Sequence, residues 1–141
     1  MLSDAHVFSS FSVDDLDAAE RFYGDALGLD VERTPMGLWL RPGPPVRSTG
    51  PDPGPGGPSG TEVFVYPKGG AHRPASFTVL NLAVDDLEGA VTWLRGRGVT
   101  FERYPGIHAE SDDEIARGGD EGPDVAWFTD PAGNVVSVLR R

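Results

Sequence analysis

The chain has 141 residues and a mass of 15.0 kDa, which is enough for one domain with a substantial core. The formal net charge is −10, and the sequence lacks the basic residues that a nucleic-acid-binding surface needs. The absence of cysteine excludes disulfides and a thiol nucleophile. The sequence shows neither a signal-peptide pattern nor an apolar run near the roughly 20 residues of a membrane helix, so we expect a cytoplasmic protein without membrane contact.

The first half alternates polar and apolar residues over 5–13, which predicts a strand. Its core face would carry Val7, Phe11 and Val13, and its other face would carry Phe8, Ser10 and Ser12. Asp14 or Asp15 is expected to cap a helix that ends at Gly28. Short strands are predicted near 29–33, 38–41 and 62–66, and the Pro- and Gly-rich segment 42–60 is predicted to be a mobile loop.

The second half repeats this order of elements. A strand is predicted over 77–84, then a helix that Asp85 or Asp86 caps and that stops near Gly98, then a strand over 99–104. Residues 105–124 form a long acidic loop in this interpretation. Strands over 125–129 and 135–139 flank the turn residues DPAGN, which predicts a hairpin.

The two helix starts are near copies of one phrase. Residues 12–23 read SVDDLDAAERFY, and residues 83–94 read AVDDLEGAVTWL. Two copies are too few for a solenoid, so we expect two copies of one supersecondary unit in one pseudo-symmetric domain.

This order of motifs, two β-α-β-β-β units with a final D-P-x-G-N, resembles the vicinal oxygen chelate superfamily of glyoxalases, extradiol dioxygenases and bleomycin-resistance proteins. The resemblance implies an α+β fold in which two tandem βαβββ modules enclose a cavity with curved mixed sheets, with the helices outside. It predicts one domain over residues 1–141, with modules at about 5–67 and 76–141. It also implies pairing through sheet edges, so a homodimer is expected.

In metal-using members of that superfamily, His or Glu side chains on the first and last strands of each module hold the ion. The resemblance places these four positions at Phe8, Phe64, Val79 and Ser137, which are poor ligands for a divalent ion. We therefore predict no metal and no other cofactor. A displaced metal site that uses His6, Glu62, His72 or His108 remains as an alternative.

Without a metal, the expected cavity is apolar with a few polar groups, as is usual for small-molecule sites. The predicted ligand-binding residues are Phe8, Ser10, Ser12, Trp39, Phe64, Tyr66, Val79, Asn81, Trp127 and Ser137. Each aromatic residue is also compatible with simple packing in the core, and the amide of Asn81 would bind either protein groups or ligand. If Glu62 points inward, it is the candidate general base or counter-charge.

Two functions fit these features. The first is a binding protein, similar to the bleomycin-resistance branch, that takes a small aromatic or cationic molecule into a metal-free cavity. The alternative is an enzyme, such as a lyase or isomerase, that uses Glu62 in acid–base chemistry or a displaced metal site. The net charge of −10 is compatible with attraction of cationic ligands and also with a simple role in solubility.

Overall fold

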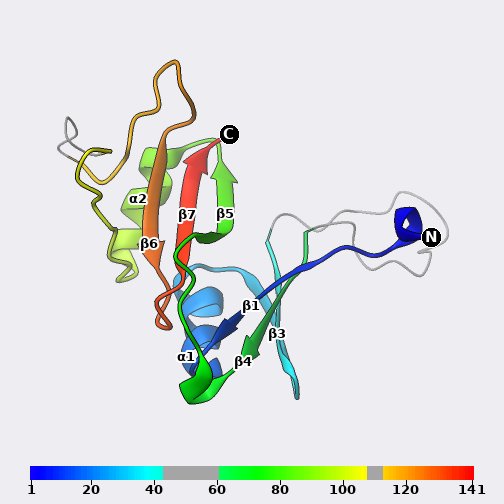
Figure 1. Ribbon diagram of the computed structural model, residues 1–141. Helices are drawn as coiled ribbons and strands as arrows, with labels where there is room; N and C mark the ends of the chain where they lie inside the picture. The colour runs from blue at the N-terminus through cyan, green and yellow to red at the C-terminus, as the bar shows by residue number, and fades with distance from the viewer. Residues whose placement is uncertain (43–60, 108–112) are drawn as a thin grey trace.

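The computed structural model describes residues 1–42, 61–107 and 113–141 (Figure 1). Residues 43–60 of the loop predicted over 42–60, and residues 108–112 of the acidic loop with His108, lie outside the described residues. The described chain forms two sheets, with strand orders β1-β4-β3-β2 and β5-β7-β6. This arrangement confirms the α+β fold class with two tandem modules. The two sheets do not close into a barrel within the described part of the chain.

The first sheet buries one face of three of its strands. β1 (Ser9–Val13) pairs in parallel with β4 (Val63–Pro67), which pairs antiparallel with β3 (Gly37–Arg41), and β2 (Asp30–Thr34) completes the sheet. The predicted core face of β1 is correct at Phe11 and Val13, which lie in the core with residues of β3 and β4, namely Leu38, Leu40, Val63 and Val65.

The predicted start of the first strand is wrong. Val7 was expected on the core face, but the strand begins at Ser9 and Val7 is 84% exposed. The reason is the length of the neighbouring strand: Ser9 pairs with Val63, the first residue of β4, so no strand is available to pair with residues 5–8 within the described chain. The segment before β1 therefore extends away from both sheets (Figure 1).

Both helices begin at an aspartate that follows the repeated valine. Asp15 accepts a hydrogen bond from the Ala18 amide before α1 (Leu16–Glu20), and Asp86 accepts one from the Gly89 amide before α2 (Leu87–Gly96). The first helix continues as a π-helical segment, η2 (Arg21–Ala26). It ends before Gly28, whose φ of 70° is the left-handed conformation that glycine adopts without strain.

The second sheet contains β5 (Thr78–Val84), β7 (Val135–Arg140) and β6 (Val125–Thr129), with α2 against one face (Figure 1). The predicted strand over 99–104 is wrong, since only Phe101 forms a bridge, to Phe128. The Val99 amide already donates to Leu94 at the end of α2, and Pro105 has no amide hydrogen to donate. Val99 and Phe101 are nevertheless buried, so the segment packs on the core without forming a ladder.

A buried polar network joins the two modules. Asp130, only 4% exposed, accepts hydrogen bonds from the Tyr23 hydroxyl at 2.8 Å and from the amides of Ala132 and Asn134, each at 2.9 Å. The side-chain amide of Asn134 donates to Asp130 at 3.1 Å and to the backbone oxygen of Ser12 at 2.8 Å. The network thus ties the second-module turn to the helix and first strand of module one.

Burial is the main cause that raises the pKa of Tyr23 well above its ordinary value of 10, and the charge of Asp130 and the hydrogen bond to it add to the effect. The phenol therefore keeps its proton and remains a donor throughout the neutral range. A buried carboxylate that receives several hydrogen bonds is satisfied without a cationic partner.

An exposed ion-pair network in the second module is centred on Glu88, which pairs with Arg117 and Arg140. The hydrogen bond from Arg117 is the largest cause that lowers the pKa of Glu88 from its ordinary 4.5 to about 2. Hydrogen bonds from the backbone and from Arg140 add to this effect. Because the folded-state pKa is lowered, the stabilisation is complete above about pH 4.5 and is lost as the pH falls toward 2. We expect Glu88→Gln to have a lower free energy of unfolding than wild type at pH 7. Near pH 2 the two proteins should have about the same free energy of unfolding, as measured by urea unfolding across this range. A difference that stays constant with pH would contradict the assignment.

Candidate functional site

The face of the first sheet that points away from the core carries a continuous series of aromatic rings. The strand register places Phe64 beside Ser10 on one side and beside Trp39 on the other. The Trp39 ring lies 4.9 Å from the Phe64 ring and 5.1 Å from the Phe8 ring, centroid to centroid. Phe64 also stacks on Tyr66 at 6.3 Å. We call these four residues, Phe8, Trp39, Phe64 and Tyr66, the aromatic platform.

The platform is partly accessible, because no helix covers it in the described chain. Phe8 is 48% exposed, and Trp39, Phe64 and Tyr66 are half-buried. These four adjacent rings are thus a partly exposed aromatic surface, the kind of surface on which planar molecules stack. Ser10 and Ser12 lie on the same face of the sheet, on β1, where they pair with Phe64 and Tyr66 of β4.

One end of the platform carries charged side chains. Glu62 is 18% exposed and accepts a hydrogen bond from Arg41 Nε at 3.0 Å, while its other carboxylate oxygen lies 3.2 Å from His6 Nε2. Arg41 also pairs with Glu32 at 2.6 Å. Both carboxylate oxygens of Glu62 therefore have partners, and the group lies at the edge of the platform rather than at its centre.

The second sheet carries the equivalent row of residues. Asn81, Ser137 and Trp127 are neighbours across β5, β7 and β6, as Ser10, Phe64 and Trp39 are in the first sheet. Ser137 is fully buried and donates a hydrogen bond to Asn81 Oδ1 at 2.6 Å. A protein group, rather than a ligand, thus already satisfies the Asn81 carbonyl. Trp127 packs edge-on against Tyr104 with 5.5 Å between ring centroids.

The structure brings the predicted site residues together in two groups, one on each sheet. Several pockets lie among the described residues, and Trp39, Phe64, Tyr66 and Trp127 line none of three of them. Ser10, Ser12 and Val79 line one of them, a pocket of about 410 Å³ between β1 and β5.

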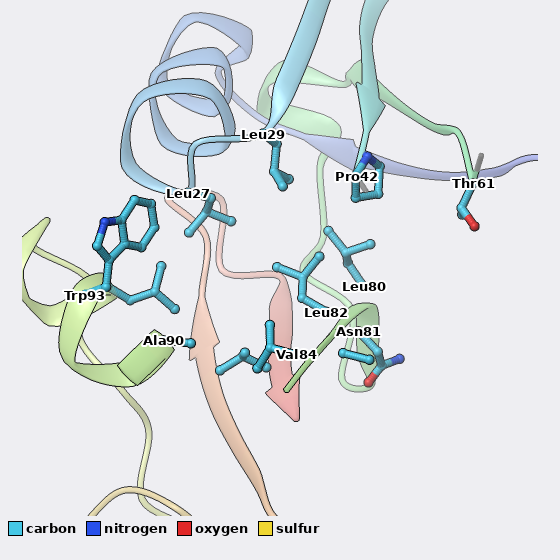
Figure 2. Close-up of a pocket in the computed structure, with 13 residues that line it drawn as sticks. Leu27, Leu29, Pro42, Thr61, Leu80, Asn81, Leu82, Val84, Ala90 and Trp93 are labelled. Atoms are coloured by element: carbon cyan, nitrogen blue, oxygen red, sulfur yellow. The ribbon is translucent and has the colours of Figure 1, made fainter. Parts of the chain in front are cut away.

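Another of the three pockets lies on the helix side of β5 (Figure 2). It has a volume of about 520 Å³, and Trp93 from α2, Leu27, Leu29, Leu80 and Leu82 line it. Leu80 and Leu82 project from the core face of β5, so core packing accounts for the apolar character of this groove. Pro42 and Thr61, which flank the undescribed residues 43–60, also line it.

Sequence reasoning missed the role of His72, which lies in the segment between the modules. His72 is 7% exposed; its Nε2 donates to the Ala132 oxygen at 3.0 Å, and its Nδ1 accepts from the Ser12 hydroxyl at 2.8 Å. His72 therefore links the two modules. It also accepts the hydrogen bond that the hydroxyl of Ser12, a predicted ligand-binding residue, would otherwise donate to a ligand. No local pattern marks it, since its partners are 60 residues away in both directions.

The positions that hold metal in related proteins do not fit an ion here. Phe8, Phe64 and Val79 offer no donor atom, and Ser137 Oγ is engaged with Asn81. Over residues 1–42, 61–107 and 113–141, no group of three or more His, Asp or Glu side chains is arranged to hold a metal ion. His6 and Glu62 do lie together, but Arg41 is their third neighbour and it repels a cation.

The family model for the glyoxalase/bleomycin resistance protein/dioxygenase superfamily matches residues 5–138. The chain therefore belongs to this superfamily, as the repeated motifs and the two sheets predict. No sequence matched in the comparison with curated proteins. Among the described helices, none has the length and apolar character needed to cross a membrane.

Solved structures with the same fold carry names that describe different functions. The chain is similar to TnmS3, an antibiotic-binding protein from Streptomyces sp. CB03234, with 23% identity, 97% coverage of both chains and a TM-score of 0.57. It is also similar to a lactoylglutathione lyase from Agrobacterium tumefaciens, with 19% identity, 97% and 93% coverage and a TM-score of 0.56. A glyoxalase family protein from Enterococcus faecalis shows 16% identity, 99% coverage of both chains and a TM-score of 0.65. These identities establish a shared fold and nothing more.

Proposed function

We propose that this protein binds a small planar molecule on the aromatic platform, without a metal ion at the positions that hold one in metal-using relatives. The observation that carries the proposal is the series of four partly exposed rings, with successive centroids 5.1, 4.9 and 6.3 Å apart. Partly exposed aromatic rings at these spacings offer a surface to a stacked ligand. The fold of the antibiotic-binding protein TnmS3 is compatible with this use of the platform.

A pair of probes with matched size tests this proposal. Titration calorimetry would compare 2-naphthamide, which is planar, with its fully saturated analogue, which has no aromatic face. We expect the planar probe to bind at least tenfold more tightly, since stacking on an aromatic side chain contributes about 1–3 kcal/mol per ring. Equal affinities would show ordinary hydrophobic binding and would contradict the role of the platform.

Catalysis with Glu62 as a general base is the second candidate function. The observation that favours it is a carboxylate that is 18% exposed at the edge of the platform. Arg41 and His6 compete with any substrate proton for its two oxygens, so the geometry favours binding over catalysis. A reaction that stops in Glu62→Gln while probe binding persists would favour the enzyme instead.

We further propose a homodimer and a cytoplasmic location. β1 and β2 end one sheet and β5 ends the other, and such strand edges offer backbone groups to a second chain, whereas Ala116 and Glu102 already bond the outer edge of β6. Light scattering is expected to give twice the chain mass of 15.0 kDa, and a mass of one chain would contradict the dimer. Cell fractionation tests the location.

A further inference from the structure

The pocket of about 410 Å³ lies where the edge strands of the two modules come close together. Ser9, Ser10 and Ser12 of β1 line one side, and Thr78 and Val79 of β5 line the other. The volume falls within the range of about 300–1,000 Å³ that small-molecule sites occupy. Four of its ten lining residues carry a hydroxyl group, whereas Thr61 alone does so among the residues that line the groove beside α2.

Arg73 is the only ionisable side chain among the described residues that line this pocket. Its Nη1 donates to the backbone oxygens of Gly70 at 3.2 Å and His72 at 2.8 Å, which fixes the guanidinium. Its remaining nitrogens make no hydrogen bond, and the side chain makes no ion pair, with any residue that the structure describes. Six other arginines do pair with carboxylates: Arg33, Arg41, Arg95, Arg117, Arg140 and Arg141.

The chain has 22 acidic and 12 basic residues, yet no acidic side chain is among the described residues that line this pocket. A guanidinium that keeps donors in a fork geometry matches the two oxygens of a carboxylate. The hydroxyls of Ser9, Ser10 and Thr78 add donors that an anion accepts. The pocket therefore suits a carboxylate despite the negative net charge of the chain. Charges in direct contact with a ligand determine its binding, while distant charges are screened by salt and mainly affect the rate of association.

The pocket continues directly from the aromatic platform. Ser10 pairs with Phe64, and Ser12 pairs with Tyr66, so one strand spacing of about 4.8 Å separates the pocket lining from the rings. We infer that the ligand is an aromatic carboxylate whose ring stacks on the platform and whose carboxylate binds Arg73. This inference rests on the proposed function, and it replaces the cationic ligand that net charge alone would favour.

Calorimetry with 2-naphthoate and 2-naphthamide tests the inference, because the two probes share the ring system and differ in charge. We expect wild type to bind 2-naphthoate at least tenfold more tightly, and Arg73→Gln to remove this preference while its affinity for 2-naphthamide stays the same. Arg21→Gln is the matched control: Arg21 is exposed on η2, and its loss changes the net charge equally without touching the pocket. It should retain the full preference.

The comparison of the two probes in wild type needs no variant, so it stands even if Arg73→Gln folds poorly. Equal binding of both probes to wild type would overturn the role of Arg73 and leave the platform intact. A preference that persists in folded Arg73→Gln would also overturn it. If neither probe binds, both the carboxylate pocket and the proposed function fail.

Discussion

Replacement of Asp130 by alanine is expected to destabilise the fold far more than the loss of any exposed ion pair. Its carboxylate accepts four hydrogen bonds, from the Tyr23 hydroxyl, two backbone amides and the Asn134 side chain. Asp130→Ala leaves these buried donors without an acceptor, and each unpaired donor costs about 1–3 kcal/mol. We expect the free energy of unfolding to fall by about 3–5 kcal/mol in urea denaturation, since the relaxed site recovers part of the loss.

The control for this substitution is Asp120→Ala, which removes the same charge from an exposed turn. Its free energy of unfolding should stay within about 0.5 kcal/mol of wild type. Tyr23→Phe should lie between the two, because it deletes one hydrogen bond and leaves one acceptor position of Asp130 unfilled. If Asp130→Ala and Asp120→Ala unfold at the same urea concentration, the network does not hold the modules together.

The second large effect concerns binding at the platform. Trp39 lies between Phe8 and Phe64, so its ring is central to the stacking surface. Trp39→Ala should weaken binding of 2-naphthamide by about tenfold or more, as expected for the loss of one stacking partner. Calorimetry gives the affinity, and circular dichroism confirms that the variant is folded.

Trp93→Ala is the matched control, because Trp93 is 48% exposed and lines the groove beside α2 rather than the platform. Its affinity for 2-naphthamide should stay within about twofold of wild type. Trp39→Phe keeps an aromatic face and should recover part of the lost affinity. An unchanged affinity in Trp39→Ala, together with weaker binding in Trp93→Ala, would move the site to the groove.

Local patterns predict much of this fold. Alternation over β1 assigns Phe11 and Val13 to the core, and the repeated V-D-D-L places a capping aspartate before each helix. The repeated order of strands puts Trp39 and Trp127 at equivalent positions of the two sheets. These features depend on neighbours within a few residues, which is the range that sequence periodicity reports.

Features that depend on distant partners escape this reasoning. Tyr23 has the spacing of an apolar helix residue, but its hydroxyl reaches Asp130, 107 residues further along the chain. Asp130 and Asn134 are typical turn residues in the sequence, yet the structure uses their side chains to join the modules. Arg73 lies in a linker without any pattern, and only the approach of β1 to β5 turns it into a pocket residue.

The most direct test of the central claim follows the three tryptophan indole N–H signals by NMR during titration with 2-naphthamide. Trp39 lies on the platform, Trp93 lines the groove, and Trp127 lies on the second sheet, so each signal reports one location. We expect the Trp39 signal to shift in proportion to occupancy while the Trp93 signal stays in place. A shift of Trp93 with an unchanged Trp39 would place the ligand beside α2 and contradict binding on the aromatic platform.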